Sequence, residues 1–177
     1  GGCTGEIVSE KGLLLTNHHC GFDWIQYHST VEHDYLTNGF WAMSQEEELP
    51  CPGISAVMLK SMEDVTDRVL EGVTKETSND ERAESVTENI KKIKEDAEAN
   101  SDYQVVIKSF YHGNKYYMIY NEVFKDVRLV GAPPSNIGKF GGDTDNWVWP
   151  RHTGDFSIFR IYVSPDGKAA DYSEDNV

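Results

Sequence analysis

Long apolar runs are missing from this sequence, and so is an excess of basic side chains. The longest apolar run near the start, Gly12 to Leu15, falls far short of the roughly 20 residues that a membrane-spanning helix needs, so we expect no membrane span. Sixteen Lys and Arg stand against 30 Asp and Glu, for a net charge of −14. Because binding to nucleic acid depends on clustered cations that neutralise phosphates, we expect no nucleic-acid partner.

The sequence also lacks the features of a targeting segment at its start. It opens with Gly1-Gly2-Cys3 and shows neither a charged stretch nor the apolar stretch of a secretory signal. We therefore expect that any targeting segment has been removed or lies outside this sequence.

Cysteine is scarce, and its odd count of three permits at most one internal disulfide. Cys3 and Cys20 are the natural pair, since they lie 17 positions apart across an expected β-hairpin, and Cys51 would remain free. A disulfide would indicate an oxidising compartment such as the periplasm, whereas two reduced cysteines would be compatible with the cytosol. We favour the disulfide.

Short apolar runs separated by turn residues predict a mainly β chain, and a length of 177 residues predicts one domain. The expected strands are a hairpin over 6–9 and 13–16, then 54–59, 103–111, 115–130 and 156–163. No internal repeat is present. These strands suggest an antiparallel β-barrel that carries a helical excursion.

A helical insert is expected over about 61–100. Valines recur there every four residues from Val65, and Ser78 followed by Glu81 is a possible capping box for a second helix. The segment from Ser61 to Asp102 holds thirteen acidic residues against six basic ones. A solvated helical face explains this better than an acidic docking surface.

The first candidate for chemistry is His19, which precedes Cys20 at the end of an expected apolar strand. A fixed imidazole in such a place can serve as a general base, as it does in chymotrypsin-like peptidases. Taken alone, it is more often a structural residue. A zinc set of Cys3, His18, His19 and Cys20 is the other alternative, which we disfavour because adjacent side chains on extended backbone point to opposite faces and the spacing fits no usual zinc pattern.

The second candidate is Asp155, which follows a glycine and precedes the last apolar strand. A carboxylate there can reach a histidine on a neighbouring strand and orient its ring. Asp143 and Asp145 compete for this role, although their surroundings also suit a turn or, more weakly, a calcium loop.

Three blocks, residues 16–21, 31–42 and 141–160, together resemble the S46 family of bacterial dipeptidyl peptidases. The resemblance covers nearly the whole chain. It implies a chymotrypsin-like (trypsin-like serine protease) double β-barrel with an additional helical domain, of which residues 1–177 would be the N-terminal part and the first half of the double barrel. It also implies a periplasmic or secreted Gram-negative enzyme that removes dipeptides from peptide N-termini.

The resemblance implies residue roles as well. His19 matches the family's general base and Asp155 matches the carboxylate that orients it. Asn146 and Trp147 match positions that hold the substrate's free amine, for which an amide and an indole are chemically suited, although a packed core tryptophan is the alternative for Trp147.

No serine in this sequence has the Gly-x-Ser-Gly setting of a nucleophile; Ser135 and Ser157 are poor substitutes. We expect the nucleophile and the second barrel beyond residue 177, an inactive fragment, no cofactor and no metal. The expected partners are peptides with a free N-terminus, the second barrel of the same chain and a possible second copy in a homodimer. The alternatives are an endopeptidase of the protease and chaperone type and a non-catalytic peptide-binding barrel.

Overall fold

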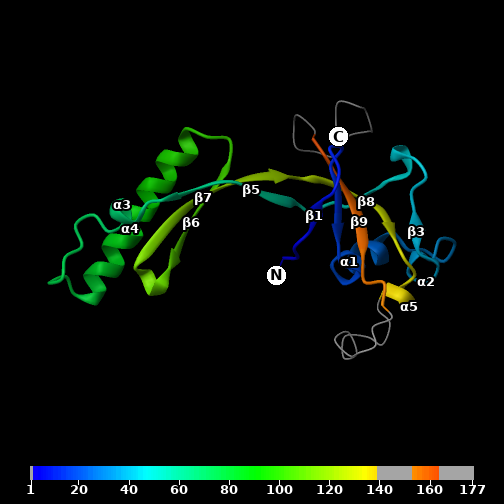
Figure 1. Cartoon of the computed structure of the whole chain (residues 1–177), viewed down its shortest axis with the longest axis horizontal. Helices are drawn as coiled ribbons and strands as arrows, with labels where there is room; N and C mark the ends of the chain where they lie inside the picture. Colours follow the sequence, from blue (N-terminus) through cyan, green and yellow to red (C-terminus); the bar gives the residue numbers. More distant parts are fainter. Residues whose placement is uncertain (1, 139–152, 164–177) are drawn as a thin grey trace. The chain divides into compact units, whose positions relative to one another are not determined.

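The computed structural model describes residues 2–138 and 153–163, and these divide into two compact units (Figure 1). The first unit consists of Gly1–Ala56 and Phe124–Val177, and the second of Val57–Val123. Among the described residues, no helix is both long enough and apolar enough to cross a bilayer.

The first unit is built on an antiparallel sheet in which β9, the last described strand, lies between β2 and β8. The strand order is β1-β2-β9-β8-β3, and β4 also pairs with β8. The strands are β1 (Glu6–Ile7), β2 (Leu13–Thr16), β3 (Phe40–Trp41), β4 (Leu49–Pro50), β8 (Asp126–Ala132) and β9 (Ser157–Tyr162). Ser157, Phe159 and Ile161 of β9 are buried at every second position, as the period of a strand requires.

The hairpin predicted near the start is confirmed, because β1 and β2 pair antiparallel. Gly12 makes the turn possible, with a positive φ of 66° and no room for a side chain: a Cβ there would lie 2.6 Å from the carbonyl oxygen of Ile161. Only glycine adopts this conformation without strain.

The barrel expected from the sequence is not closed in the described residues. The strands form an open path with β1 at one end and β3 at the other. The structure supports an antiparallel sheet of short strands, with a helical segment inserted between them in the sequence. Sequence patterns of alternating residues specify pairing partners but not whether the first and last strands of a sheet meet.

Helix α1 (His18–His28) covers the sheet of the first unit, with Ile25 fully buried against strands β8 and β9. Ile25, Leu129 and Phe159 belong to the apolar core of the first unit. The expectation that residues 17–21 form an extended strand end is therefore wrong: the chain turns into helix directly after Asn17.

A buried charged cluster ties several segments of the first unit together. The Glu48 carboxylate accepts hydrogen bonds from Arg160 Nε and from the Tyr162 hydroxyl, both at 2.8 Å. Arg128 pairs with Asp126 in a bidentate arrangement, and its guanidinium carbon lies 3.9 Å from the centre of the Tyr162 ring. Burial, followed by the hydrogen bond to Glu48, raises the pKa of Tyr162, so its hydroxyl remains a donor.

Cys51 is a free, buried thiol, as the odd cysteine count predicts. Burial raises the pKa of Cys51 to about 12. Because only the thiolate is nucleophilic, we expect iodoacetamide at pH 8 to leave Cys51 unmodified in the folded protein and to modify it fully in denaturant. Mass spectrometry of the labelled peptides measures this, and rapid labelling under native conditions would contradict it.

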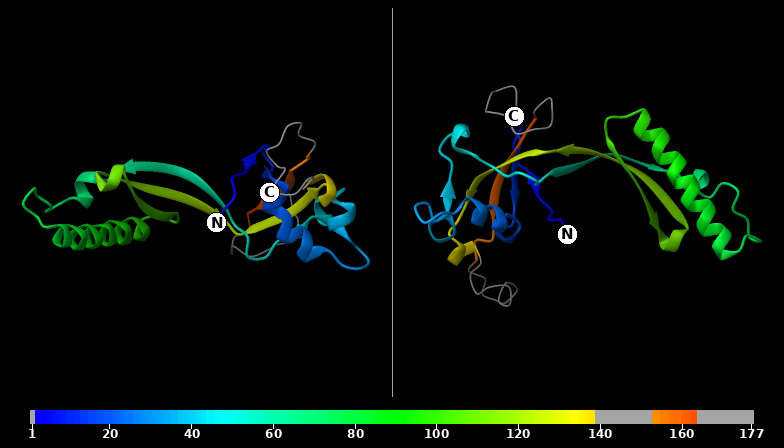
Figure 2. Two further views of the ribbon diagram at one scale, coloured as in Figure 1. Left: turned by 90° about the horizontal axis from the view of Figure 1, so that it is seen from below. Right: turned by 180° about the vertical axis from the view of Figure 1, so that it is seen from behind.

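The second unit contains a three-stranded sheet of order β5-β7-β6. The strands are β5 (Ala56–Asp64), β6 (Gln104–Phe110) and β7 (Lys115–Phe124). Helix α4 (Asn79–Ala99) lies along one face of this sheet (Figure 2). Ile93 from the helix and Val105 and Met118 from the strands belong to the buried core between them.

The capping box predicted at Ser78 and Glu81 is confirmed at the start of α4. The helical insert begins later than predicted, since β5 continues to Asp64 and only Thr66–Val69 (α3) is helical before α4. The strand predicted over 115–130 is divided into β7 and β8 at Lys125. Val65 and Val69 are buried in the core of the second unit, whereas Val73 is only partly buried, and no continuous helix contains all three.

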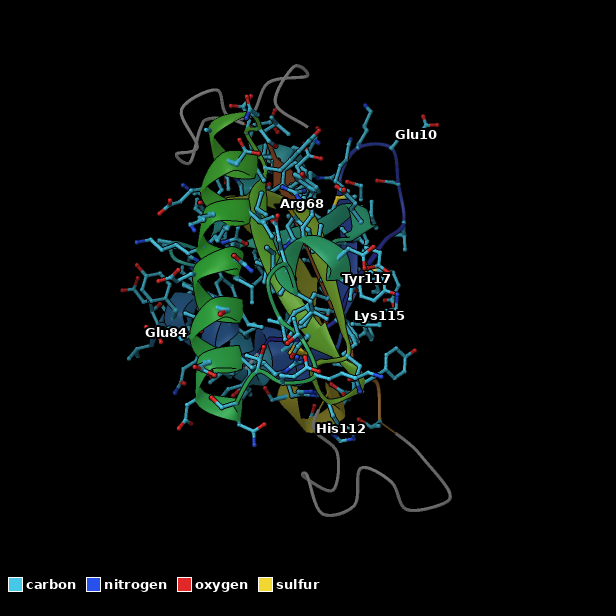
Figure 3. All side chains as sticks on the ribbon, turned by 90° about the vertical axis from the view of Figure 1, so that its left-hand side faces the viewer. Glu10, Arg68, Glu84, His112, Lys115 and Tyr117 are labelled. Carbon is cyan, nitrogen blue, oxygen red and sulfur yellow. A yellow bond between two sulfur atoms is a disulfide. The ribbon has the colours of Figure 1, made fainter. Side chains whose placement is uncertain are left out.

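The outward side of α4 is solvated, as expected from its acidic composition. Glu84 points away from the strands, while Lys115 and Tyr117 extend from β7 (Figure 3). Lys94 and Glu98 form an exposed pair one helical turn apart, at 3.5 Å. Such a pair contributes little to stability but suits a helix surface in water.

Candidate active site

The candidate site lies where helix α1 begins and where β9 begins. Pairing of Thr16 with Ser157 places the end of β2 beside the start of β9. Asn17 and His19 follow Thr16, and Asp155 precedes Ser157, so the register of these two strands brings together residues that are more than 130 positions apart.

His19 and Asp155 contact each other twice. The ring nitrogen Nδ1 of His19 lies 3.1 Å from Oδ2 of Asp155, and the backbone N–H of His19 donates to Oδ1 at 3.2 Å. The Asp155 side chain is 10% exposed, whereas that of His19 is 52% exposed. The carboxylate is thus enclosed, and the imidazole remains accessible from solution.

Asp155 also caps helix α1 from a different strand. Asn17 occupies the cap position but makes no side-chain capping bond within the helix. The Asp155 carboxylate accepts the N–H of His19 in the first turn instead, where a negative charge interacts favourably with the helix dipole. One carboxylate therefore fixes both the backbone and the ring of His19.

Asn17 holds Asp155 in turn. Its Nδ2 donates to Asp155 Oδ2 at 3.1 Å and to the Asp155 carbonyl oxygen at 3.2 Å. The hydroxyl of Ser157 donates to the carbonyl oxygen of Asn17 at 2.8 Å. Together these bonds fix the Asp155 carboxylate relative to Asn17 at the start of α1, and fix Asn17 relative to Ser157 at the start of β9.

The Asp155 carboxyl is held in its ionised form. Burial raises its pKa, but hydrogen bonds from the His19 backbone and ring, the charge of His19 and the backbone N–H of His18 outweigh burial, and the pKa lies below the ordinary value of 3.8. An Asp with a lowered folded-state pKa stabilises the fold above its unfolded-state pKa, and this contribution is lost as the pH falls through the folded-state value. An ionised Asp155 can only accept a hydrogen bond from the ring, so in the neutral imidazole it favours the tautomer that carries its proton on Nδ1.

A short helix, α5 (Ser135–Gly138), supports the residues that lead into Asp155. The carbonyl oxygen of Ile137 accepts hydrogen bonds from the N–H of Gly154, at 3.0 Å, and from the hydroxyl of Thr153, at 3.0 Å. The ring of buried His18 packs directly on Gly138, where a Cβ would lie 2.3 Å from the ring. Through this contact helix α1 packs directly on α5, the helix that holds Thr153 and Gly154 in place before Asp155.

Cys3 and Cys20 form a disulfide, with their Cα atoms 6.0 Å apart, as the sequence predicts. The bond fastens the segment before β1 to the first turn of α1, next to His19. A ring nitrogen of His19 and the two Sγ atoms lie within 4.8 Å of one another. His18 is not part of this group, because its ring is buried against Gly138.

Comparison with known proteins identifies the family. A model of the family described as Peptidase S46 matches residues 1–177. The chain belongs to the peptidase S46 family. The S46 resemblance inferred from the sequence is therefore confirmed.

Curated relatives and solved structures of S46 proteins match the chain over its whole length. It is 56% identical over 177 residues to an Asp/Glu-specific dipeptidyl-peptidase of Flavobacterium psychrophilum, covering 100% of this chain and 25% of the relative. It is 52% identical over 179 residues to dipeptidyl-peptidase 7 of Porphyromonas gingivalis, covering 99% and 25%. The crystal structure of Porphyromonas endodontalis DPP11 in complex with the dipeptide Arg-Glu matches with a TM-score of 0.77 and 51% identity, covering 100% of this chain and 27% of that one.

This S46 chain spans about a quarter of the length of the curated relatives that it matches. Of its predicted site residues, the structure brings His19, Asp155, Cys3 and Cys20 together, and the catalytic roles of the first two stay predictions. Asn146 and Trp147 lie outside the described residues, as do the competing acids at 143 and 145.

Sequence reasoning missed Asn17 and Ser157, which hold the Asp155 carboxylate and its neighbour in place. Asn17 carried a usable signal, since asparagine is a preferred residue immediately before a helix. Recognising that cap would have predicted that His19 lies in the first turn of a helix.

Proposed function

We propose that the full-length protein is a serine dipeptidyl peptidase, which releases dipeptides from the N-termini of peptides and oligopeptides through an acyl-enzyme. The observation that carries this proposal is the paired contact between His19 and an enclosed, ionised Asp155 in a chain that belongs to the S46 family. Relatives that bear dipeptidyl-peptidase names support the reaction class.

In the proposed mechanism, His19 acts as general base and then as general acid. Nε2 takes the proton from a serine hydroxyl as its oxygen attacks the carbonyl carbon of the second peptide bond. The imidazolium then gives that proton to the departing amine, and water later attacks the acyl-enzyme by the same exchange. Asp155 holds Nδ1–H and stabilises the imidazolium, which its ionised state at neutral pH allows.

We propose that the first unit is the first half of a chymotrypsin-like double barrel, with the second unit as its helical insert. The nucleophile, the oxyanion hole and the second barrel would come from the remainder of the chain, as would an additional helical domain. Support comes from the antiparallel sheet and from the similarity to a structure four times as long. By itself the chain of 177 residues is expected to be inactive, since it holds only part of this machinery.

Asn146 and Trp147 are proposed to bind the free amine of the substrate. An amide oxygen accepts a hydrogen bond from an ammonium group, and an indole attracts it by cation–π interaction. If these side chains also stopped the peptide from extending beyond its amine, release would be limited to dipeptides.

A periplasmic or secreted location is proposed for the full-length enzyme. The Cys3–Cys20 disulfide supports it, since disulfides persist in oxidising compartments.

The full-length protein tests the function with matched peptide substrates that have either a free or a blocked N-terminus. We expect release of dipeptides from free peptides only. Because relatives named Asp/Glu-specific and relatives named dipeptidyl-peptidase 7 match at 56% and 52% identity, each pair is made with an acidic and with a hydrophobic second residue. Cleavage of the blocked peptides would favour an endopeptidase instead.

Replacing Asn17 by alanine in the full-length enzyme is expected to lower kcat about 10-fold and to leave KM unchanged. The variant loses one hydrogen bond to a charged carboxylate, worth about 1.5–3 kcal/mol when fully made, part of which the remaining donors on Asp155 recover. Steady-state kinetics on the best dipeptide substrate measures both parameters.

Asn100→Ala is the matched control, because Asn100 donates only to a backbone carbonyl at the end of α4. It should leave kcat unchanged. A rise in KM with constant kcat for Asn17→Ala would contradict the proposed role, since that pattern indicates a loss of uniform substrate binding.

A further inference from the structure

The cluster of Cys3, His19 and Cys20 brings two sulfur atoms to the histidine proposed as the base. A ring nitrogen of His19 and both Sγ atoms lie within 4.8 Å of one another. With the disulfide formed, neither sulfur is a thiolate and neither can ligate a metal ion. The same three side chains have a different chemistry once the bond is reduced.

We propose that reduction of the Cys3–Cys20 disulfide creates a binding site for a thiophilic divalent ion such as Zn²⁺, with Cys3, Cys20 and His19 as its three protein ligands. We further propose that the bound ion withdraws His19 from catalysis. The metal site stands on the geometry alone, whereas the loss of activity also rests on the proposed peptidase function.

The distances fit such a site. Zn–S bonds of about 2.3 Å and Zn–N bonds of about 2.0–2.1 Å place two ligand atoms of a tetrahedral ion about 3.5–3.8 Å apart. The ring nitrogen of His19 and both sulfurs lie within 4.8 Å of one another, so a shift of about 1 Å brings them into this range. Reduction breaks the bond between the two sulfurs, and rotation of the cysteine side chains then separates them to the distance that a tetrahedral ion requires.

The disulfide is open to reduction by a dithiol. Cys3 is exposed, and Cys20 is partly exposed. A thiolate of the reductant attacks one sulfur and the other leaves as a thiolate; the second thiol of the reductant then releases the first sulfur. The protein gains two electrons and two thiols, and the reductant becomes a disulfide. Binding of Zn²⁺ displaces the thiol protons.

The surroundings of His19 match those of a metal-ligating histidine. Such residues usually donate one ring N–H to a carboxylate, which fixes the ring and raises the basicity of the other nitrogen. Asp155 is already placed to accept from Nδ1 at 3.1 Å. An ion on Nε2 would take the lone pair that accepts the serine proton, and an ion on Nδ1 would displace Asp155, so either arrangement stops the base from working.

The test uses the full-length protein, oxidised and reduced, titrated with Co²⁺ as a spectroscopic probe and with Zn²⁺. We expect reduced protein to bind one Co²⁺, with visible bands of a tetrahedral ion and a thiolate-to-metal charge-transfer band, and oxidised protein to show neither. In the reduced state, Cys3→Ser should weaken binding by more than about 100-fold, since loss of a direct ligand costs at least as much as loss of an outer partner. Asn100→Ala is the matched variant that keeps all three ligands and should bind with comparable affinity.

Folding of the reduced protein is followed through Cys51. Cys3 and Cys20 should react with iodoacetamide while buried Cys51 stays protected, as read from the labelled peptides. Reaction of Cys51 as well would show that reduction unfolds the core of the first unit and would overturn the proposal. So would equal Co²⁺ binding by the Cys3→Ser variant or by the oxidised protein.

Activity is measured separately on the reduced enzyme. We expect Zn²⁺ at one equivalent to abolish dipeptide release and a chelator to restore it, with the oxidised enzyme unaffected. Metal binding without any dipeptide release in either state would defeat the proposed function and leave the metal site standing. Dipeptide release by the Zn²⁺-loaded enzyme at the metal-free rate would overturn the proposed withdrawal of His19.

Discussion

In the full-length enzyme, Asp155→Asn should lower kcat on the order of 10⁴-fold while the protein stays folded. The carboxamide keeps the size of the carboxylate, and its oxygen can still accept the N–H of His19 in the first turn of α1. It loses the charge that stabilises the imidazolium. Its NH₂ group facing Nδ1 would favour the tautomer that protonates Nε2, which is unable to accept a proton from serine. Steady-state kinetics measures kcat, and circular dichroism shows whether the variant stays folded.

Asp64→Asn is the matched control for this substitution. Asp64 also has a pKa lowered to about 2, first by its hydrogen bond with Thr66 and then by Lys115, but it lies in the second unit. It should change kcat by less than about twofold, as expected for a surface substitution in a unit that holds none of the described site residues. If Asp155→Asn kept more than a tenth of the activity, Asp155 would not be the orienting carboxylate.

Arg160→Met should destabilise the first unit by about 3–5 kcal/mol. Arg160 Nε donates to Glu48 at 2.8 Å, and the two side chains are only 13% and 2% exposed. Removing the guanidinium leaves the Glu48 carboxylate buried, with the Tyr162 hydroxyl as its described hydrogen-bond donor and only the charge of Arg128 to offset its own. Hydrogen exchange of the amides of β8 and β9 in the folded protein measures the free energy of opening.

Lys94→Met is the control, because it breaks an exposed ion pair of similar chemistry. Its cost should stay below about 0.5 kcal/mol. Adding Glu48→Gln to Arg160→Met should recover part of the loss, since the neutral amide carries no buried charge and still accepts from Tyr162. Equal costs for Arg160→Met and Lys94→Met would show that the buried pair contributes no more than a surface pair.

The local elements of this chain were predictable because short-range chemistry determines them. The hairpin of β1 and β2 follows from two apolar runs around Gly12, and the start of α4 follows from the Ser78 and Glu81 capping pair. Both signals lie within a few residues of the structure that they specify.

Features that depend on distant residues were not predictable in the same way. The first turn of α1 at His18 was expected to be extended, because the carboxylate that caps it comes from Asp155. The valines at positions 65, 69 and 73 repeat at helical spacing, yet helix α3 covers only Thr66–Val69, and the two that are buried, Val65 and Val69, belong to a core shared with strands β6 and β7. The open order of strands is likewise set by pairings across the whole chain, which no local pattern reveals.

The candidate site was predicted in part. Resemblance to a family led to His19 and Asp155, and the structure places their side chains in contact. Neither composition nor spacing could have identified the 3.1 Å bond from Asn17 that holds Asp155, since it depends on the register of β2 against β9. The side chains at 146 and 147 stay predictions.

The cap that Asp155 provides for α1 has a consequence for synthesis of the protein. On the ribosome, the β1–β2 hairpin and the sequence of α1 emerge long before β9, which completes the sheet beside β2 and brings the carboxylate. Until then, one edge of β2 has no neighbour and the first turn of α1 lacks its acceptor. The alignment of His19 by Asp155 can therefore be completed only after that strand has been made, which places it among the late steps of folding.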